Sequence, residues 1–316
     1  MIDCHVHLAA FRTADNGCYI SPRLLNSPLF RFLSWKHGLD AEDASKSNQK
    51  YVDDLLAELR RSKYVEKAVL LGMDGVYDST GRLDLVRTDF LIGNDYVLNI
   101  ARSYPNDFLA GVSINPQRRD AIDELERCTE TGAKLVKVLP YTQGFDPCNR
   151  YYIPFYKKLA QRKIPLLSHV GYEFTLAGQD QSVGDPGKLR VALDEGVTVI
   201  AAHGCSYGLF FYERYIPTFL NLVRLYTNFF SDVSALTLPN RVGMLLRLRR
   251  YPETHSRLLF GTDYPHLVFR WPCWGRGSGV SLREIGLADN RFDRQYLILK
   301  SLGVDFRSFD HLTSSP

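Results

Sequence analysis

The chain has 316 residues, a formal net charge of +4, a hydrophobic fraction of 45% and a charged fraction of 23%. These values are ordinary for a soluble globular protein, and a chain of this length can bury a core without disulfides or a structural metal. Lys and Arg are spread along the sequence and no run approaches the ~20 apolar residues of a membrane span, so we expect no nucleic-acid partner and no membrane partner.

Eight short apolar runs alternate with amphipathic stretches along the chain, which is the pattern of repeated βα units. We predict strands over residues 1–8, 65–74, 108–116, 133–140, 164–171, 198–204, 228–236 and 257–265. Helical spacing is clearest at Val52, Leu55, Leu56 and Leu59, recurs at 121–125, and predicts a last helix over 295–303.

Eight βα units in one chain predict an α/β fold, a (β/α)8 TIM barrel that forms a single domain over residues 1–316. An open doubly wound sheet is the alternative, but the first turn lacks a GxGxxG pattern. Three segments after predicted strands are long: residues 9–47, 75–91 and 266–280. In a barrel such segments form the mouth of the active site, so we expect binding loops or lids there.

The cysteines bear on the compartment. Six are present and none forms a CxxC pair, which argues against a disulfide scaffold and a zinc ribbon: Cys4, Cys18, Cys128, Cys148, Cys205 and Cys273. The sequence does not open with a basic segment followed by an apolar one. We therefore expect a reducing, cytoplasmic location.

Ionisable side chains fall near the carboxyl ends of the predicted strands. His5 and His7 are two residues apart on the first strand, so their imidazoles point to one face. Four more polar residues occupy the ends of later strands: Lys137, His169, His203 and Asp263. Each would be costly to bury alone, and a shared metal ion would provide a common partner. Any one of them could instead be an ordinary, satisfied core residue.

The motifs around these residues resemble those of the amidohydrolase superfamily. IDCHVHL, SHVG, AHG and LLFGTDYP occur in the order typical of the amidohydrolase-related branch, which contains both hydrolases and zinc-dependent decarboxylases. The resemblance implies that His5, His7 and His169 bind a divalent metal. Asp263 would bind the metal or accept a proton from its water, and His203 would polarise the substrate or move a proton.

Lys137 leaves the number of metal ions open. In binuclear members of the superfamily a fourth-strand lysine is carboxylated and bridges two ions, with His169 and His203 on the second ion. The alternative is a lysine paired with a carboxylate or with the substrate. We favour one zinc ion per chain, with manganese or iron as alternatives, and a carboxylated Lys137 with two ions as the competing hypothesis.

Substrate contacts are expected on the loops. Tyr172 and Glu173 follow His169 closely enough to line the mouth, and His266 follows Asp263. Trp271 belongs to the segment 269–277, whose aromatic and arginine side chains suit a lid over a planar or anionic substrate. That segment could equally pack on the barrel or on another subunit.

The leading functional hypothesis is hydrolysis of an amide, ester or lactone of a small, carboxylate-bearing substrate by metal-activated water. The alternative is non-oxidative decarboxylation of an aromatic or unsaturated acid. A metal-dependent nuclease is disfavoured by Lys137, where such enzymes usually have glutamate, and by the lack of a basic stripe. A barrel that only binds a ligand is disfavoured by the complete set of candidate ligands. A homodimer is an expectation from the family resemblance.

Overall fold

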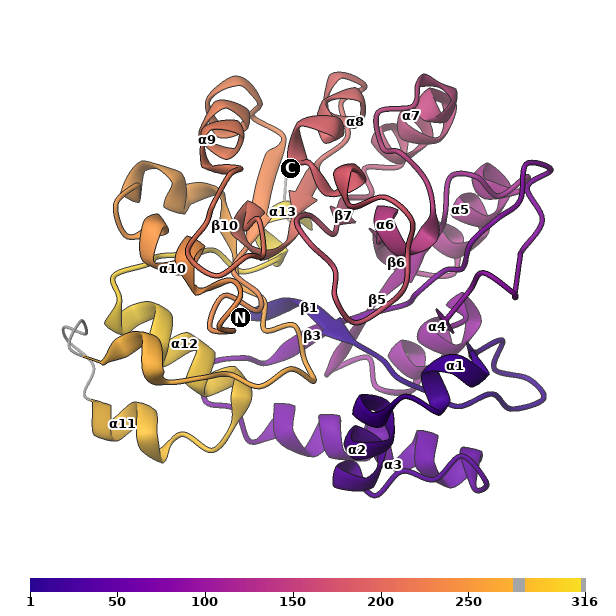
Figure 1. Cartoon of the computed structure of the whole chain (residues 1–316), viewed down its shortest axis with the longest axis horizontal. Helices are drawn as coiled ribbons and strands as arrows, with labels where there is room; N and C mark the ends of the chain where they lie inside the picture. Colours follow the sequence, from indigo (N-terminus) through magenta and orange to yellow (C-terminus); the bar gives the residue numbers. More distant parts are fainter. Residues whose placement is uncertain (275–281, 314–316) are drawn as a thin grey trace.

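The computed structural model describes residues 1–274 and 282–313. Eight parallel strands form one sheet in the order of the chain (Figure 1). They are β1 (Ile2–His7), β3 (Lys67–Leu71), β5 (Phe108–Ser113), β6 (Ala133–Val138), β7 (Leu166–Ser168), β8 (Val199–Ala201), β9 (Phe229–Asp232) and β10 (Leu258–Leu259). Each lies inside a predicted strand and is shorter than predicted.

The sheet closes between its first and last members. Cys4 N donates to Phe260 O at 3.0 Å, His7 N donates to Tyr264 O at 2.9 Å, and Asp263 N donates to His5 O at 2.9 Å. These bonds join β1 to the segment that begins with β10 and follows it. The predicted (β/α)8 barrel is therefore confirmed, and the open-sheet alternative is wrong.

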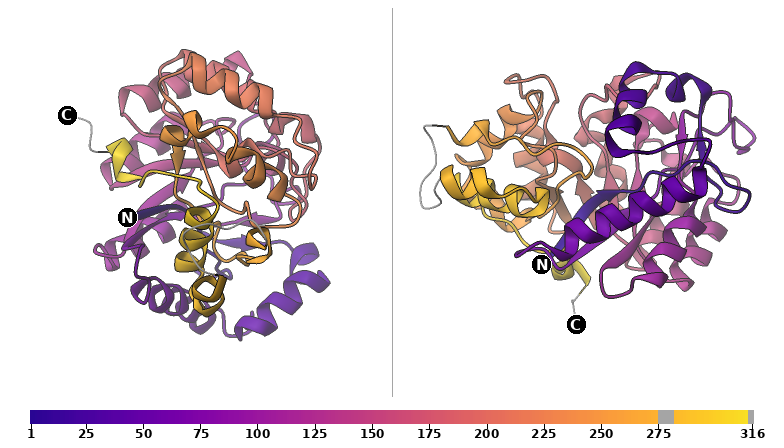
Figure 2. Two further views of the ribbon diagram at one scale, coloured as in Figure 1. Left: turned by 90° about the vertical axis from the view of Figure 1, so that its left-hand side faces the viewer. Right: turned by 90° about the horizontal axis from the view of Figure 1, so that it is seen from below.

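Helices cover the outside of the strands (Figure 2). The main ones are α3 (Ala44–Arg60), α4 (Asn94–Ser103), α5 (Ala121–Glu130), α7 (Ile153–Gln161), α8 (Arg190–Asp194), α9 (Ile216–Leu225), α10 (Val242–Leu248), α11 (Leu282–Leu287) and α12 (Arg291–Ser301). The predicted apolar stripe of α3 is buried at Val52, Leu55, Leu56 and Leu59. The other two predicted helices correspond to α5 and α12. None of the helices in the described ranges is both long and apolar enough to cross a membrane.

The barrel interior has an apolar floor beneath its polar mouth. Leu135 precedes Lys137 by two residues and Leu167 precedes His169 by two, so each pair shares a face of its strand. Both leucines are fully buried in a cluster with Val69, Ile200 and Leu259. Phe309, next to the short helix α13 (Asp310–Thr313), belongs to the same cluster. The polar side chains therefore stand on a packed base.

The first two long segments are more structured than predicted. Residues 9–47 contain β2 (Tyr19–Ile20), α1 (Pro22–Leu25) and α2 (Pro28–His37), and residues 75–91 end in β4 (Phe90–Leu91). Ser21 and Ser27 cap the two helices with their hydroxyls, and a proline follows each as the first helical residue. Serine at the cap and proline next are typical helix starts. Our prediction of binding loops or lids overlooked these Ser-Pro pairs and the helices that they begin.

Three rim segments are tied together at one carboxylate. β2 and β4 pair as an antiparallel ribbon, with Tyr19 opposite Leu91. Beside the ribbon, Asp89 accepts a hydrogen bond from Ser21 Oγ at 2.8 Å and one from Ala177 N at 3.1 Å. The segments after β1, β3 and β7 therefore share one anchor. Of the third long segment, residues 266–274 are described and include the 3-10 helix η6 (Trp271–Cys273); the rest of the predicted 266–280 loop and of segment 269–277 lies outside the described residues.

Candidate metal centre

The structure brings the candidate ligands to one end of the barrel. His5 and His7 lie on β1 and Lys137 on β6, and His169 directly follows β7. His203 lies in the 3-10 helix η4 (Ala202–Cys205) after β8, and Asp263 follows β10. Parallel strands of a barrel end at the same face, so residues far apart in sequence meet there.

Three donor atoms lie at the separations expected around one metal ion. His5 Nε2 is 3.2 Å from His7 Nε2, and each of these nitrogens is 3.3 Å from Asp263 Oδ1. Ligand atoms bound at about 2.0–2.1 Å to one tetrahedral ion would lie roughly 3.3–3.4 Å apart. Two imidazoles and a carboxylate are also ligand types that zinc, manganese and iron accept. The residues therefore fit a single divalent cation.

The protonation of these groups favours metal binding. Burial lowers the pKa of His7 to about 4, although Asp263 opposes the shift. Burial alone would raise the pKa of Asp263, but His5, His266 and His7 hold it well below its usual range. A neutral imidazole and an ionised carboxylate are the forms that bind metal ions.

His169 and His203 form a neighbouring pair. His203 Nε2 is 3.3 Å from His169 Nδ1, and the ring of His203 stacks at 5.2 Å on that of His5. Burial, and next the charge of Arg241, lower the pKa of both His169 and His203 well below the ordinary value. His169 Nε2 is buried and has no hydrogen-bond partner within residues 1–274 and 282–313. His169 thus lies beside the His5–His7–Asp263 group and is linked to it through His203.

Two residues of the centre have a left-handed backbone. His203 has φ 59° and Asp263 has φ 64°. This region is uncommon for residues other than glycine, and such conformations gather at functional sites. Both residues follow short strands, so the chain turns sharply as it leaves the barrel wall.

Lys137 is fully buried beside His5. Its Nζ lies 3.1 Å from His5 Nε2, and burial lowers its pKa to about 8, with Asp232 and Asp263 opposing the shift. A lysine that is partly neutral near physiological pH is compatible with either of the predicted roles. Its contact with His5 places it against the candidate metal site.

Sequence reasoning overlooked Asp232, Ser234 and Arg241. Asp232 Oδ2 is 2.8 Å from His5 Nδ1, and Ser234 Oγ is 2.8 Å from His203 Nδ1. Asp232 ends β9, so the signal used for the other strands, a polar residue at the end of an apolar run, was present there too. Arg241 lies in a connection between elements, where no sequence pattern indicated its position.

Arg241 is a buried cation close to the centre. Its side chain donates from Nη2 to Tyr172 O at 3.1 Å, whereas Nη1 is buried and has no hydrogen-bond partner in the part of the chain that the structure describes. The residue is only 4% exposed. A buried guanidinium nitrogen without a hydrogen bond costs folding free energy. A bound ligand that places an acceptor at this atom would remove that cost.

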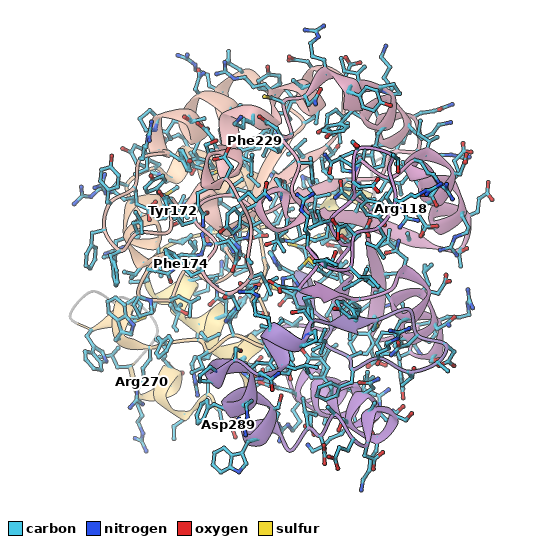
Figure 3. The ribbon with its side chains drawn as sticks, turned by 45° about the vertical axis from the view of Figure 1, so that its right-hand side comes forward. Arg118, Tyr172, Phe174, Phe229, Arg270 and Asp289 are labelled. Atoms are coloured by element: carbon cyan, nitrogen blue, oxygen red, sulfur yellow. The ribbon has the colours of Figure 1, made fainter. Side chains whose placement is uncertain are left out.

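The four predicted substrate contacts differ in position. Glu173 Oε2 lies 3.7 Å from His169 Nε2, and His266 Nε2 lies 3.8 Å from Asp263 Oδ2. Tyr172 stacks on Phe174 with ring centroids 5.8 Å apart, on the rim segment labelled in Figure 3. Trp271 begins η6, which packs against α12. Among the described residues, the structure thus brings Glu173 and His266 to the centre, with Tyr172 adjoining Arg241.

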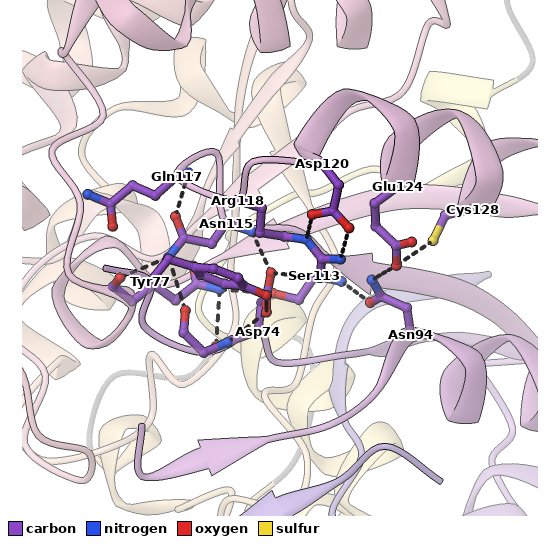
Figure 4. A network of polar contacts seen from close by, with 12 residues as sticks. Asp74, Tyr77, Asn94, Ser113, Asn115, Gln117, Arg118, Asp120, Glu124 and Cys128 are labelled. Carbon is purple, nitrogen blue, oxygen red and sulfur yellow. Dashed lines mark hydrogen bonds and ion pairs between the residues drawn. The ribbon is translucent and has the colours of Figure 1, made fainter. Parts of the chain in front are cut away.

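A separate polar network braces the mouth on the side of β3 and β5 (Figure 4). Asp74 accepts hydrogen bonds from Asn115 N at 2.7 Å and from the Tyr77 hydroxyl at 2.9 Å, and Arg118 Nη1 lies 3.6 Å away. A cleft of about 470 Å³ opens beside the network, and its lining includes Arg118 and Arg119 but none of the histidines. This network holds two rim segments together, and its member Ser113 donates from Oγ to Lys137 O at 2.8 Å.

Comparisons with known proteins agree with the fold. A family model described as amidohydrolase matches residues 2–274. No curated protein sequence matches the chain. An uncharacterised TIM-barrel protein from Bordetella bronchiseptica is similar in structure, with a TM-score of 0.59 and 18% identity over 94% of this chain and 98% of that one.

Two further similar structures come from enzymes. A probable 2-pyrone-4,6-dicarboxylic acid hydrolase from Acinetobacter baumannii, with citric acid bound, has a TM-score of 0.55 and 14% identity over 99% of this chain and 94% of that one. A dihydroxybenzoic acid decarboxylase from Polaromonas, with bound manganese and 2-nitroresorcinol, has a TM-score of 0.51 and 16% identity over 94% and 96%. At these identities the similarity concerns the fold.

Proposed function

The chain belongs to the amidohydrolase family of enzymes, and on that premise we propose that it hydrolyses an amide, ester or lactone of a small carboxylate-bearing molecule. We propose one divalent metal ion per chain as cofactor, zinc first and manganese second. The observation that carries the proposal is the group of His5 Nε2, His7 Nε2 and Asp263 Oδ1, which lie 3.2–3.3 Å from one another.

These three residues would hold the cation, with His169 as the fourth candidate. When bound, a divalent cation lowers the pKa of a coordinated water towards ~7 and polarises a carbonyl oxygen. Asp263 contacts both imidazoles through Oδ1, which leaves Oδ2 to accept the proton of the attacking water. His203 would hold or pass on a proton at Nε2. The buried floor of the barrel excludes bulk water from this side.

Arg241 supports a carboxylate-bearing substrate. Arg241 lies close enough to His169 that, after burial, its charge is the next cause of the lowered pKa of that histidine. A substrate carboxylate at the centre could therefore accept a hydrogen bond from Arg241 Nη1, which has no partner among the described residues. An arginine recognises a carboxylate with strong, charge-assisted hydrogen bonds. Glu173 and Glu213, which act on Arg241 electrostatically, would keep its charge compensated before substrate binds.

The test is a substrate screen with an Asp263→Asn variant as control. Zinc content per chain is measured first, followed by hydrolysis of lactones, esters and amides that carry a carboxylate. Asp263→Asn keeps the shape of the side chain and removes its capacity to take up a proton. Turnover should fall by at least 100-fold in that variant, the order expected for loss of a general base. Full turnover in Asp263→Asn would contradict the assignment.

Non-oxidative decarboxylation is the second candidate. The stacked rings of Tyr172 and Phe174 next to Arg241 suit a planar aromatic acid. The similar structures include a dihydroxybenzoic acid decarboxylase as well as a probable hydrolase. Release of carbon dioxide from hydroxybenzoic acids, without consumption of any ester or lactone, would favour this reaction over hydrolysis.

A further inference from the structure

Asp232 is saturated with hydrogen-bond donors. Its Oδ1 accepts from His203 N at 2.9 Å and from Ser234 N at 3.0 Å, and its Oδ2 accepts from His5 Nδ1 at 2.8 Å. A carboxylate that receives several N–H groups in a buried position is ionised and acts only as an acceptor. Although His5, His203 and Asp232 lie close enough to hold a metal ion, Oδ1 of Asp232 already accepts from three donors and Oδ2 from His5 Nδ1. This carboxylate therefore supports the site from behind.

The direction of the Ser234 hydroxyl follows from this. Ser234 Oγ makes a very short contact with Asp232 Oδ1. Since Asp232 only accepts, the single hydroxyl proton of Ser234 lies on that contact. Ser234 Oγ must then accept from its other neighbours, His203 Nδ1 at 2.8 Å and His5 Nδ1 at 3.1 Å. The δ-nitrogens of both histidines therefore carry the ring protons.

The ring proton of His169 can be assigned from its contact with His203. If Nδ1 of neutral His203 carries the proton, its Nε2 is an acceptor, and the partner 3.3 Å away is His169 Nδ1. His169 must then donate from Nδ1, which leaves its buried, unpartnered Nε2 as a bare acceptor. His5 agrees with the same scheme, because Lys137 Nζ, which donates, lies 3.1 Å from His5 Nε2.

We infer that Asp232 and Ser234 are positioning residues that fix His5, His203 and His169 as Nδ1–H tautomers, so that His5 and His169 present unprotonated Nε2 atoms. That these two atoms serve a metal ion rests on the proposed function; the tautomers themselves do not. A hydrogen bond to the remote nitrogen of a ligating histidine sets both its tautomer and its orientation. One carboxylate on β9 thereby arranges rings that come from three other parts of the barrel wall.

The first test measures tautomers in the metal-free protein. Nitrogen-15 NMR of histidine-labelled chain distinguishes Nδ1–H from Nε2–H rings, and single His→Gln variants assign the signals. We expect the Nδ1–H form for His5, His203 and His169. An Nε2–H ring at His203 or His169 in the unsubstituted protein would overturn the inference. This result does not depend on metal or on turnover.

The second test uses a matched pair of buried serines, Ser231 on β9 and Ser234 just after it. Ser234→Ala removes the hydroxyl between Asp232 and His203, whereas Ser231→Ala removes a buried hydroxyl that bonds Ala201 O. Ser234→Ala should shift the His203 and His169 tautomers and leave His5, which keeps Asp232, unchanged. It should also weaken zinc binding about 10-fold, the scale known for remote partners of metal ligands, while Ser231→Ala binds zinc normally.

The outcomes separate the two proposals. If Ser234→Ala leaves all three tautomers in the Nδ1–H form, the chain of hydrogen bonds does not set them and the inference is wrong. If the tautomers are as expected but the unsubstituted protein binds no zinc or manganese, the positioning role stands and the proposed metal-dependent function fails.

Discussion

Thr262 donates its hydroxyl to Asp3 Oδ2 at 2.6 Å, although the two residues are 259 positions apart. Thr262 N also contacts Asp3 Oδ1 at 3.2 Å, and the same oxygen accepts from His5 N at 2.8 Å. This buried carboxylate therefore joins the two strands that close the barrel. It also holds the backbone of a candidate metal ligand, so barrel closure and site geometry depend on the same bonds.

Replacing Thr262 by valine should destabilise the fold. The substitution keeps the shape and leaves Asp3 Oδ2 buried without its hydroxyl donor, which costs about 1–3 kcal/mol of unfolding free energy. Thr254→Val is the control, because Thr254 is equally buried but its hydroxyl bonds only the nearby Tyr251 O. Urea unfolding measures both variants. Equal losses of unfolding free energy in the two variants would contradict a special role for the Thr262–Asp3 hydrogen bond.

Gly261→Ala should weaken metal binding. A Cβ at residue 261 would lie 3.1 Å from His5 Cβ and 3.2 Å from Ser234 Cβ, which is tighter than ordinary van der Waals contact. Either side chain must then move by a few tenths of an ångström. We expect zinc affinity to fall by about 10-fold or more, as for other disturbances behind metal ligands. The control is Gly286→Ala, whose Cβ would meet, among the described residues, only the end of the Arg270 side chain. Titration calorimetry with zinc measures both.

Arg241→Met should impair substrate binding more than folding. Methionine retains much of the volume but removes the guanidinium whose Nη1 has no hydrogen-bond partner among the described residues. Loss of a hydrogen bond to a charged group costs about 1.5–3 kcal/mol, or roughly 10- to 150-fold in kcat/KM. The effect should disappear for a substrate analogue with an amide in place of the carboxylate. An equal loss for both substrates would mean that Arg241 has only a structural role.

Metal binding should persist at mildly acidic pH. A proton competes with the metal for His7 only below its folded-state pKa of about 4, whereas an exposed histidine would be protonated below about 6.5. Zinc affinity should therefore change little on this account between pH 7.5 and 5.5 and fall as the pH approaches 4. Calorimetry at several pH values, with circular dichroism to verify folding, measures this. A steep loss of affinity near pH 6.5 would contradict the prediction.

The barrel was predictable because its strands are apolar runs bounded by polar loops, and each of the eight occurs where expected. The family assignment is confirmed by the amidohydrolase match over residues 2–274. Selecting ionisable residues at the carboxyl ends of the predicted strands brought His5, His7 and Asp263 into one group. The same selection overlooked Asp232 at the end of the seventh strand. Ser234 and Arg241 could not be found in this way, because their positions depend on turns beyond the strands.

Other expectations remain predictions. They are the ligand roles of the site residues, zinc as the metal, the single domain, the homodimer and the cytoplasmic location. The Ser-Pro helix starts in residues 9–47, in contrast, were legible in the sequence and would have corrected the loop prediction.

The ribbon of β2 and β4, with Asp89 beside it, has a consequence for altering the specificity of this enzyme. Because Asp89 also accepts a hydrogen bond from Ala177 N, exchange of one rim segment removes partners from two others. Libraries that vary the segments after β1, β3 and β7 separately should yield mostly unstable proteins. Segments exchanged together from one donor barrel, with Asp89 and its partners Ser21, Arg23 and Ala177 retained, should yield folded variants with new substrate ranges.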